Sequence, residues 1–418
     1  MLAFMKKLWR DKRGNALIIG AGSLPLLIGS VGLATDTVQW TLWKRQLQRA
    51  ADSAAYAGVY AKFQDGSPNT AVATDLGNNN HLWVPLLGGY PQVSEPIDTT
   101  AYTKQVEVGL AVQQQLGFSS MFMSAAPIIT VTARAAAIDG DDFCVVALEN
   151  TNESGIIIQG STNVNMGCGM ISNSPSSSVS VGVNGTAHNV TAEPVAGAGG
   201  VPDINGVDTE TSYHLAQPDP YKDKYSTDIP PSETCGGMSD NHAAVQTPGK
   251  TTLDPGCYSG NNQFKFTGGN YHLNPGTYYL DSIDFIANGG TITGTGVTII
   301  LTGSSPGQIS MNGNATLQLS APTDPTDPYY KLLLMQSPTA ANILNANVIN
   351  GGTSSLLDGT IYIPNQKVTF SGSSSASTRC AMVVARRVEF AGNANIQNDT
   401  VGCVANSKVL GKVIRLIA

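Results

Sequence analysis

The hydrophobic pattern of the chain opens with a stretch from Gly14 to Thr35 that contains no charged residue. At a rise of about 1.5 Å per residue, a helix of this length crosses a hydrocarbon core of about 30 Å. We therefore expect one membrane-spanning helix at about 15–35. The alternative is a cleaved secretory signal, for which the small residues at 32–34 would suit a peptidase. The apolar stretch is longer than the roughly 7–15 residues of a usual signal core, which favours the retained helix.

The pattern continues from Asp36 to about Phe63 as an amphipathic helix. One face repeats at helical spacing and is built mainly of small residues: Leu47, Ala51, Ala54, Ala55 and Gly58. Polar and charged side chains take the other side: Lys44, Arg45, Gln48, Arg49 and Asp52. Small side chains allow a neighbouring element to approach closely, so this face should pack on another part of the protein. Residues 1–63 are thus expected to form a basic tail, a membrane helix and its helical extension.

Two stretches of alternating apolar residues follow in the next region. Positions 106, 108 and 110 predict a strand over 105–112, and positions 129, 131 and 133 predict another over 128–137. With the preceding helix they would make a small α+β region, similar to a reduced pilin, over 64–140. The alternative is that these strands begin the following domain.

A short repeat appears in the remaining part, 141–418. The pattern of apolar, any, apolar, any, Gly recurs at 156–160, 264–268, 309–313, 368–372 and 388–392. The last two copies are 20 residues apart, and the stretches before them, 361–365 and 381–385, also align. Short strands with glycine corners at this period are typical of a parallel β-helix, in which stacked coils bury a continuous core.

A stretch rich in Pro and Asp at about 190–250 interrupts this pattern. It predicts an irregular excursion from the β-helix, and such long loops are where binding is often found. The fold class expected from the whole pattern is mainly β, with an N-terminal transmembrane helix, a small α+β region and a disulfide-containing β-helix.

The cysteine spacing fits stacked coils. Consecutive cysteines are separated by 24, 22 and 23 residues within each pair, which is about one coil. Residues one coil apart lie about 4.8 Å from each other, within the Cα separation of roughly 4.4–6.8 Å that a disulfide bridges. The predicted pairs are Cys144–Cys168, Cys235–Cys257 and Cys380–Cys403. No histidine lies at metal-ligand spacing from a cysteine pair, so disulfides in an oxidising compartment are favoured over zinc.

Charge sets the expected orientation. Five cations and one anion precede the uncharged stretch, which predicts a cytoplasmic N-terminus and an exported body. The net charge is −7, and no basic cluster occurs beyond the N-terminus, so nucleic acid is not an expected partner.

The sequence contains no recognisable catalytic, cofactor-binding or metal-binding set. The histidines are scattered, and HExxH, GxSxG, P-loop and dinucleotide motifs are missing. The densest charges on a predicted coil are Lys367, Arg386, Arg387 and Glu389. A β-helix enzyme acting on polysaccharide could use such groups. A solvated outer face explains them more simply.

Several N-terminal motifs resemble one known family. Arg13-Gly14-Asn15, the span with Pro25, the run 32–36 and Leu47–Ala55 are similar to the N-terminal region of TadE/TadG-like proteins, which belong to the bacterial Flp (tight-adherence, type IVc) pilus assembly machinery. The resemblance covers about sixty residues. Ile19 occupies the position where prepilin peptidase sites carry Glu, five residues after the Gly, so the chain resembles the uncleaved TadG side of the family.

The resemblance implies a non-enzymatic structural component of pilus assembly. It would be a single-pass protein of the bacterial inner membrane with a periplasmic or cell-surface body. Its partners would be other pilus-assembly or pilin-like subunits, contacted through the N-terminal helix. The alternative is a surface adhesin that binds a glycan through the 190–250 excursion.

Overall fold

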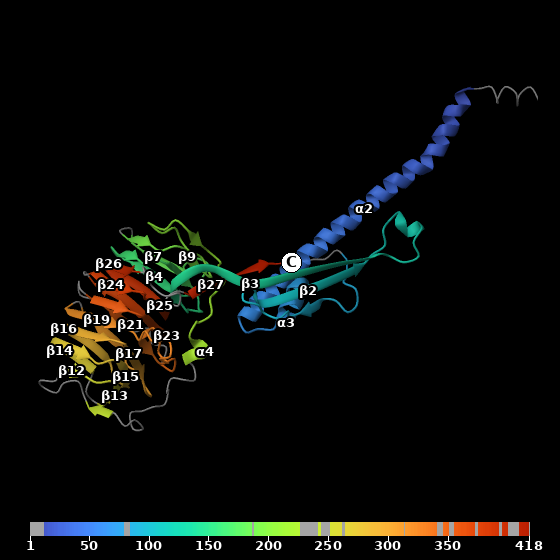
Figure 1. Cartoon of the computed structure of the whole chain (residues 1–418). Coiled ribbons are helices and arrows are strands. Elements are labelled where there is room, and N and C mark those ends of the chain that lie inside the picture. Colours follow the sequence, from blue (N-terminus) through green and yellow to red (C-terminus); the bar gives the residue numbers. More distant parts are fainter. Residues whose placement is uncertain are drawn as a thin grey trace, which may run out of the picture. The chain divides into compact units, whose positions relative to one another are not determined.

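The computed structural model describes residues 12–78, 84–185, 188–225, 241–243, 251–260, 264–312, 314–340, 346–350, 355–372, 375–392, 395–399 and 409–417. The chain divides into two compact units, Met1–Ile138 with Ile414–Ala418, and Asp139–Val413 (Figure 1). The residues from Ile414 onward therefore belong to the first unit, although the sequence placed all of 141–418 in the β-helix. The reason is that Ile414 packs against the core of the first unit, and the Ile417 N–H donates to the Arg134 carbonyl at 2.9 Å.

The first unit combines two helices with a small antiparallel sheet. Its elements are α2 (Lys12–Phe63), α3 (Pro68–Asn78), β1 (Gln92–Ser94), β2 (Thr103–Gln113), the 3-10 turn η1 (Ser119–Met121) and the first part of β3 (Ile128–Ala147). β2 pairs with both β1 and β3. Both predicted strands are thus present, and β3 runs ten residues further than expected. α3 was not predicted; its start fits Pro68 at the first helical position, with Ser67 Oγ accepting from the Thr70 N–H at 3.4 Å.

The Ala-rich face of α2 forms the core of this unit. Leu47, Ala51, Ala54 and Ala55 are at most 1% exposed and belong to one buried cluster with the inward side chains of β2 and β3. The close approach depends on Gly58, because a Cβ there would lie 2.8 Å from the Val106 side chain. The amphipathic pattern read from the sequence is confirmed.

The second unit is a parallel β-helix whose described strands form three stacks. The first stack contains, in spatial order, β10 (Glu210–Thr211), β9 (Val195–Gly197), β6 (Gly169–Ser172), β3, β25 (Val383–Gly392), β23 (Thr360–Gly372), β20 (Leu332–Gln336), β17 (Val297–Thr302), β15 (Gly276–Asp281), β13 (Gly256–Ser259) and β11 (Asn241–Ala243).

The second stack contains β7 (Val181–Asn184), β4 (Ile156–Gln159), β25, β23, β21 (Ala346–Ile349), β18 (Ile309–Met311), β16 (Phe285–Thr295) and β14 (Phe264–Leu273). The third contains β8 (Asn189–Thr191), β5 (Asn163–Asn165), β26 (Asn395–Asp399), β24 (Ser375–Arg379), β22 (Ser355–Asp358), β19 (Ala315–Ser320), β16, β14 and β12 (Thr252–Leu253). The described chain also has α4 (Lys222–Tyr225) and β27 (Val409–Leu416).

The coils do not stack in sequence order. The coil at 144–165 has the coil at 169–191 on one side and the coil at 383–399 on the other. The chain therefore begins the β-helix at an internal coil and builds towards one end. It then resumes at the other end, near 241–259, and builds back to the coil where it began. We call the contact between the coils 144–165 and 383–399 the seam.

The five-residue repeat marks the second stack. The first three residues of all five copies lie in β4, β14, β18, β23 and β25, and Ile156, Val368 and Val388 are in register. Gly160 ends one copy with φ +84°, and a Cβ there would lie 2.7 Å from the Gly392 carbonyl oxygen, so glycine is required at this corner.

The predicted alignment of 361–365 with 381–385 is wrong by two residues. Ile361 pairs with Val383, whereas Lys367 pairs with Arg387, with an irregularity between them. Pro364 lies within this irregularity, and proline cannot donate to a strand ladder. A shift of two residues keeps each side chain on the same face of the sheet, so successive side chains still alternate between the inner and the outer face.

The predicted excursion at 190–250 is shorter at its beginning than expected. Residues up to Thr211 still belong to the β-helix through β8, β9 and β10. Among the residues that follow, Gln217 and Tyr225 are each 2% exposed, whereas Tyr213 is 71% exposed. The outer row of the first stack is apolar, and the tyrosines at 221 and 225 cover it. Residues 226–240 and 244–250 lie outside the described part of the chain.

The structure contains the disulfide Cys144–Cys168, with a Cα separation of 5.8 Å. Cys257 and Cys380 are also disulfide-bonded. Their expected partners, Cys235 and Cys403, lie outside the described residues, so these two pairings stay predictions.

Candidate functional site

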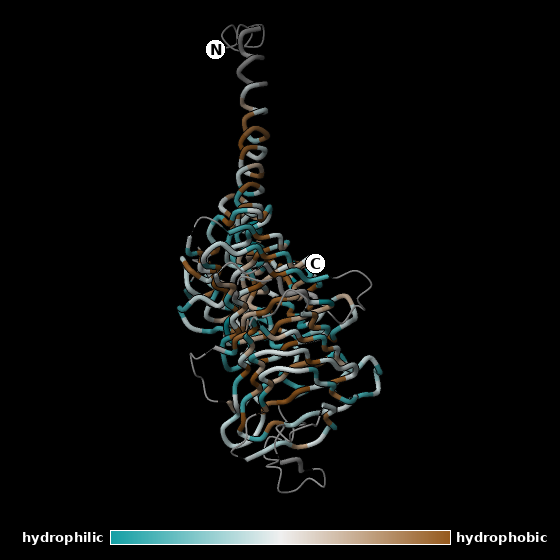
Figure 2. Tube along the Cα trace, turned by 90° about the vertical axis from the view of Figure 1, so that its left-hand side faces the viewer, coloured by the Kyte–Doolittle hydropathy of each residue, from teal (hydrophilic) through white to brown (hydrophobic). Residues whose placement is uncertain are grey.

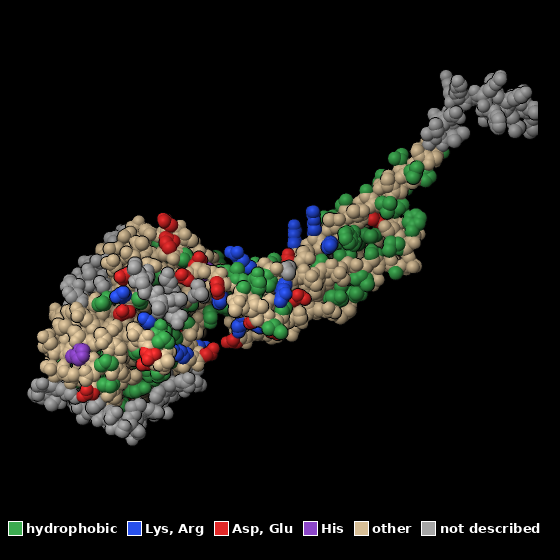
Figure 3. Space-filling view, viewed as in Figure 1, with side chains coloured by type: hydrophobic (Ala, Val, Ile, Leu, Met, Phe, Trp, Pro, Cys, Tyr) green, Lys and Arg blue, Asp and Glu red, His purple; other side chains and the backbone are tan. Residues whose placement is uncertain are grey.

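The first part of α2 exposes apolar side chains to its surroundings. Leu26 is 76% exposed, and Leu27 and Val31 are each 62% exposed. Figure 2 shows the hydrophobic colour along this part of the helix, and Figure 3 shows its hydrophobic side chains on the surface. Among the described residues, one helical segment, Gly20–Phe63, is long and apolar enough to cross a membrane, with 6% of its most apolar window buried. A helix that exposes apolar residues in this way is suited to lipid rather than water.

The loop between β2 and β3 docks on α2 where the uncharged stretch ends. Asp36 is 4% exposed. Its carboxylate accepts the backbone N–H of Phe118 at 2.9 Å, and both the backbone N–H and the hydroxyl of Ser119 at 2.5 Å. One turn earlier, Gly32 leaves room for the Phe118 ring, because a Cβ there would lie 2.3 Å from it. Gly32 and Asp36 together fasten the loop to the helix.

The loop supplies three hydrogen bonds to the Asp36 carboxylate. A carboxylate that accepts several hydrogen bonds from the protein can leave bulk solvent at lower cost than a bare one. The sequence drew attention to the run 32–36 but gave no sign of its partner. Phe118 and Ser119 lie more than eighty residues away, in a loop whose composition carries no motif.

Residues 14–61 match the family of putative Flp pilus-assembly TadE/G-like proteins. The match confirms the resemblance found in the sequence, and it coincides with α2. The TadE/G-like segment contains the exposed apolar part of α2, both loop-docking residues and most of the buried Ala face. This family supports a pilus-related structural role and membrane anchoring by α2. No curated protein and no solved structure matches the chain.

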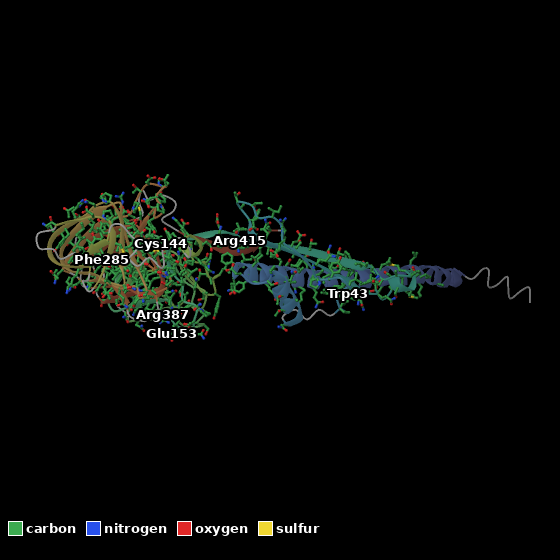
Figure 4. The ribbon with its side chains drawn as sticks, turned by 90° about the horizontal axis from the view of Figure 1, so that it is seen from below. Trp43, Cys144, Glu153, Phe285, Arg387 and Arg415 are labelled. Carbon is green, nitrogen blue, oxygen red and sulfur yellow. A yellow bond between two sulfur atoms is a disulfide. The ribbon has the colours of Figure 1, made fainter. Side chains whose placement is uncertain are left out.

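The charged residues noted on the β-helix form ion pairs with buried glutamates at the seam and on the neighbouring coil. Arg386 Nε lies 3.1 Å and Arg387 Nε 2.5 Å from the same oxygen of Glu149, whose side chain is fully buried. Lys367 Nζ lies 2.5 Å from Glu389, which is 7% exposed and also accepts from Gln159. These groups lie on the outer face, as expected, and Lys367, Arg386 and Arg387 keep side-chain exposures of 24%, 21% and 14%, whereas the glutamates that pair with them are buried. Figure 4 shows Arg387 beside Glu153, whose carboxylate lies 4.0 Å from it.

Glu149 stays ionised at this position. Burial alone would raise its pKa, but hydrogen bonds from Arg386, Thr151 and Arg387 outweigh burial and lower the pKa to about 2. Sequence reasoning missed Glu149, because the arginines that pair with it lie more than 230 residues away. The pairs between Glu149 and the two arginines join the coil 144–165 to the coil 383–399.

The remaining polar groups of the described residues bear on two possibilities, a metal site and histidine chemistry. Across the described ranges, no group of three or more His, Cys, Asp or Glu side chains could hold a metal ion. His214 packs edge-on against Phe143 at 5.7 Å between ring centroids, and His272 contacts Thr293 at 3.1 Å. These two histidines thus make separate local contacts.

Proposed function

We propose that the protein is a non-enzymatic, membrane-anchored structural component of Flp/Tad-type pilus assembly. The observation that carries the proposal is that the TadE/G-like match falls on α2, whose first part is apolar and exposed. The helix then serves as the anchor, and its Ala face fixes the small sheet of the first unit directly to that anchor.

The cations before the uncharged stretch favour a cytoplasmic N-terminus and a body outside the inner membrane. The Cys144–Cys168 disulfide supports this orientation, because structural disulfides persist in oxidising compartments. The continuous core of the β-helix makes the second unit a stiff body. Other pilus-assembly subunits would contact the exposed part of α2. The adhesin alternative gains no support from Tyr221 and Tyr225, which pack on the β-helix.

Deletion and complementation in the parent bacterium test the proposal. We expect deletion of the gene to abolish piliation, measured by electron microscopy and by pilin in the sheared fraction. The full chain should restore it. The double variant Leu26→Arg/Leu27→Arg should leave the membrane fraction and fail to restore piliation, because each buried charge costs about 2.5–3.5 kcal/mol at the centre of a membrane helix.

The matched control is Tyr56→Arg/Tyr60→Arg, which adds the same charges to the same helix at positions 39% and 47% exposed beyond the uncharged stretch. This variant should stay in the membrane fraction and restore piliation. Normal piliation in the deletion strain, or full restoration by a chain that has left the membrane, would contradict the proposal.

A further inference from the structure

The loop between β2 and β3 carries an exposed apolar tip that the anchor alone does not explain. No charged residue occurs in the 26 positions between Glu107 and Arg134. Met121 and Phe122 are each 75% exposed, Met123 is 49% exposed, and Ile128 at the start of β3 is 54% exposed. Single exposed apolar residues are ordinary in soluble proteins, but a contiguous group that includes Phe and Met marks a surface that something covers.

The position of this tip along α2 is fixed by the contacts already described. Phe118 packs at Gly32, three residues inside the end of the uncharged stretch, and Asp36 binds the loop one turn later. At about 1.5 Å per residue, Gly32 lies roughly 5 Å within the end of the span. Figure 1 shows the loop with η1 beside α2. If α2 crosses the bilayer over 15–35, the tip lies at the depth of the outer interface.

We infer that the β2–β3 loop inserts into the outer leaflet of the lipid bilayer beside α2, as a second membrane contact. The inference rests on the membrane anchoring in the proposed function. Lipid is the occupant that fits, because the tip continues the exposed apolar surface of α2, where Val31 and Leu33 are 62% and 57% exposed at the same level. Trp40, 37% exposed one turn beyond Asp36, has the amphipathic side chain that is enriched at membrane interfaces.

The charge pattern agrees with this depth. Asp36 is the first charged residue after Arg13, and its carboxylate accepts three hydrogen bonds from the loop. The next charged residues along the helix are Lys44 and Arg45, which are exposed two turns further from the bilayer. With two attachments, α2 and the loop, the first unit is held against rotation about the helix axis.

Depth-dependent fluorescence quenching tests the inference in the full chain. The variants Leu27→Cys, Phe122→Cys and Ile97→Cys are each labelled with an environment-sensitive, thiol-reactive fluorophore, and the parent chain is the labelling blank. They are reconstituted into vesicles of phosphatidylcholine and phosphatidylglycerol that contain spin-labelled phosphatidylcholine. Ile97 is the matched control, because it is apolar, 90% exposed and precedes β2, whereas Phe122 follows β2. Eleven strand residues put the two loops roughly 30 Å apart.

We expect quenching by spin-labelled lipid at position 122 to approach that at position 27 and to exceed that at position 97 several-fold. Quenching by aqueous iodide should follow the opposite order. The loop inference is overturned if spin-labelled lipid quenches position 27 while iodide reaches position 122 as readily as position 97. The anchor would still stand in that case. Shielding of 122 from both quenchers would assign the tip to a second copy and also overturn it. Loss of lipid quenching at 27 would overturn the anchor itself.

Discussion

Replacing Glu149 with glutamine should weaken the seam of the β-helix. Glutamine has nearly the same shape and keeps an oxygen that can accept the two hydrogen bonds from Thr151, at 2.9 and 2.8 Å. It removes the negative charge that Arg386 and Arg387 share. The two guanidinium groups, with side chains 21% and 14% exposed, are then left close together without the carboxylate they share, and Arg387 keeps only the exposed Glu153 at 4.0 Å.

The pKa of Glu149 gives the size of the effect. A fall from 4.5 to about 2 corresponds to roughly 3 kcal/mol of preference for the charged form in the folded protein. The arginines keep some contact with water, and solvent screens part of this interaction, so we expect a loss of about 2 kcal/mol at pH 7. Because the pKa is lowered on folding, the contribution is complete above about pH 4.5 and disappears as the pH falls towards about 2.

The assay is urea unfolding of the full chain under non-reducing conditions, at pH 7 and at pH 3, followed by circular dichroism. Glu153→Gln is the matched control, because Glu153 is 70% exposed and lies 4.0 Å from Arg387. We expect the control to change the free energy of unfolding by less than about 0.5 kcal/mol. The reasoning is refuted if Glu149→Gln costs no more than the control at pH 7, or if its cost is as large at pH 3.

Three further results are expected. Gly32→Leu should release the β2–β3 loop from α2 and increase amide hydrogen exchange at residues 117–119, because a side chain at position 32 collides with the Phe118 ring. Gly29→Leu has open space around it and should leave this exchange unchanged. Phe390→Ala should cost about 3–5 kcal/mol in urea unfolding, because the ring is fully buried in the second stack. Cys144→Ser with Cys168→Ser should cost about 3 kcal/mol for the loop of 24 residues, and an unchanged midpoint would show that this bond contributes nothing.

The repeating features of the structure could be read from the sequence because they depend on local spacing. The Ala face of α2 follows from helical periodicity, and the second stack follows from its glycine corners. The alternation at 106–110 and 129–133 gave two strands of the first unit. In each case the information lies within a few residues, and neighbouring positions determine which face is buried.

The long-range contacts could not be read in this way. Nothing around Glu149 shows that its partners are Arg386 and Arg387, because stacking order is not encoded by the repeat itself. The same holds for Asp36 and the loop at 118–119. The helix α3 was missed for a different reason, since Pro is favoured both in turns and at the first position of a helix.

The order of coils in the β-helix has a consequence for how the body matures. The coil at 144–165 is made early in synthesis, yet one of its two neighbours, 383–399, comes more than 200 residues later. Until then the early coil presents an open sheet edge, which is a ready template for wrong pairing. Closing it requires contacts of very large sequence separation, which form slowly. The β-helix is therefore complete only when nearly the whole chain has been made, so a product truncated before residue 383 keeps an unpaired sheet edge on its first coil.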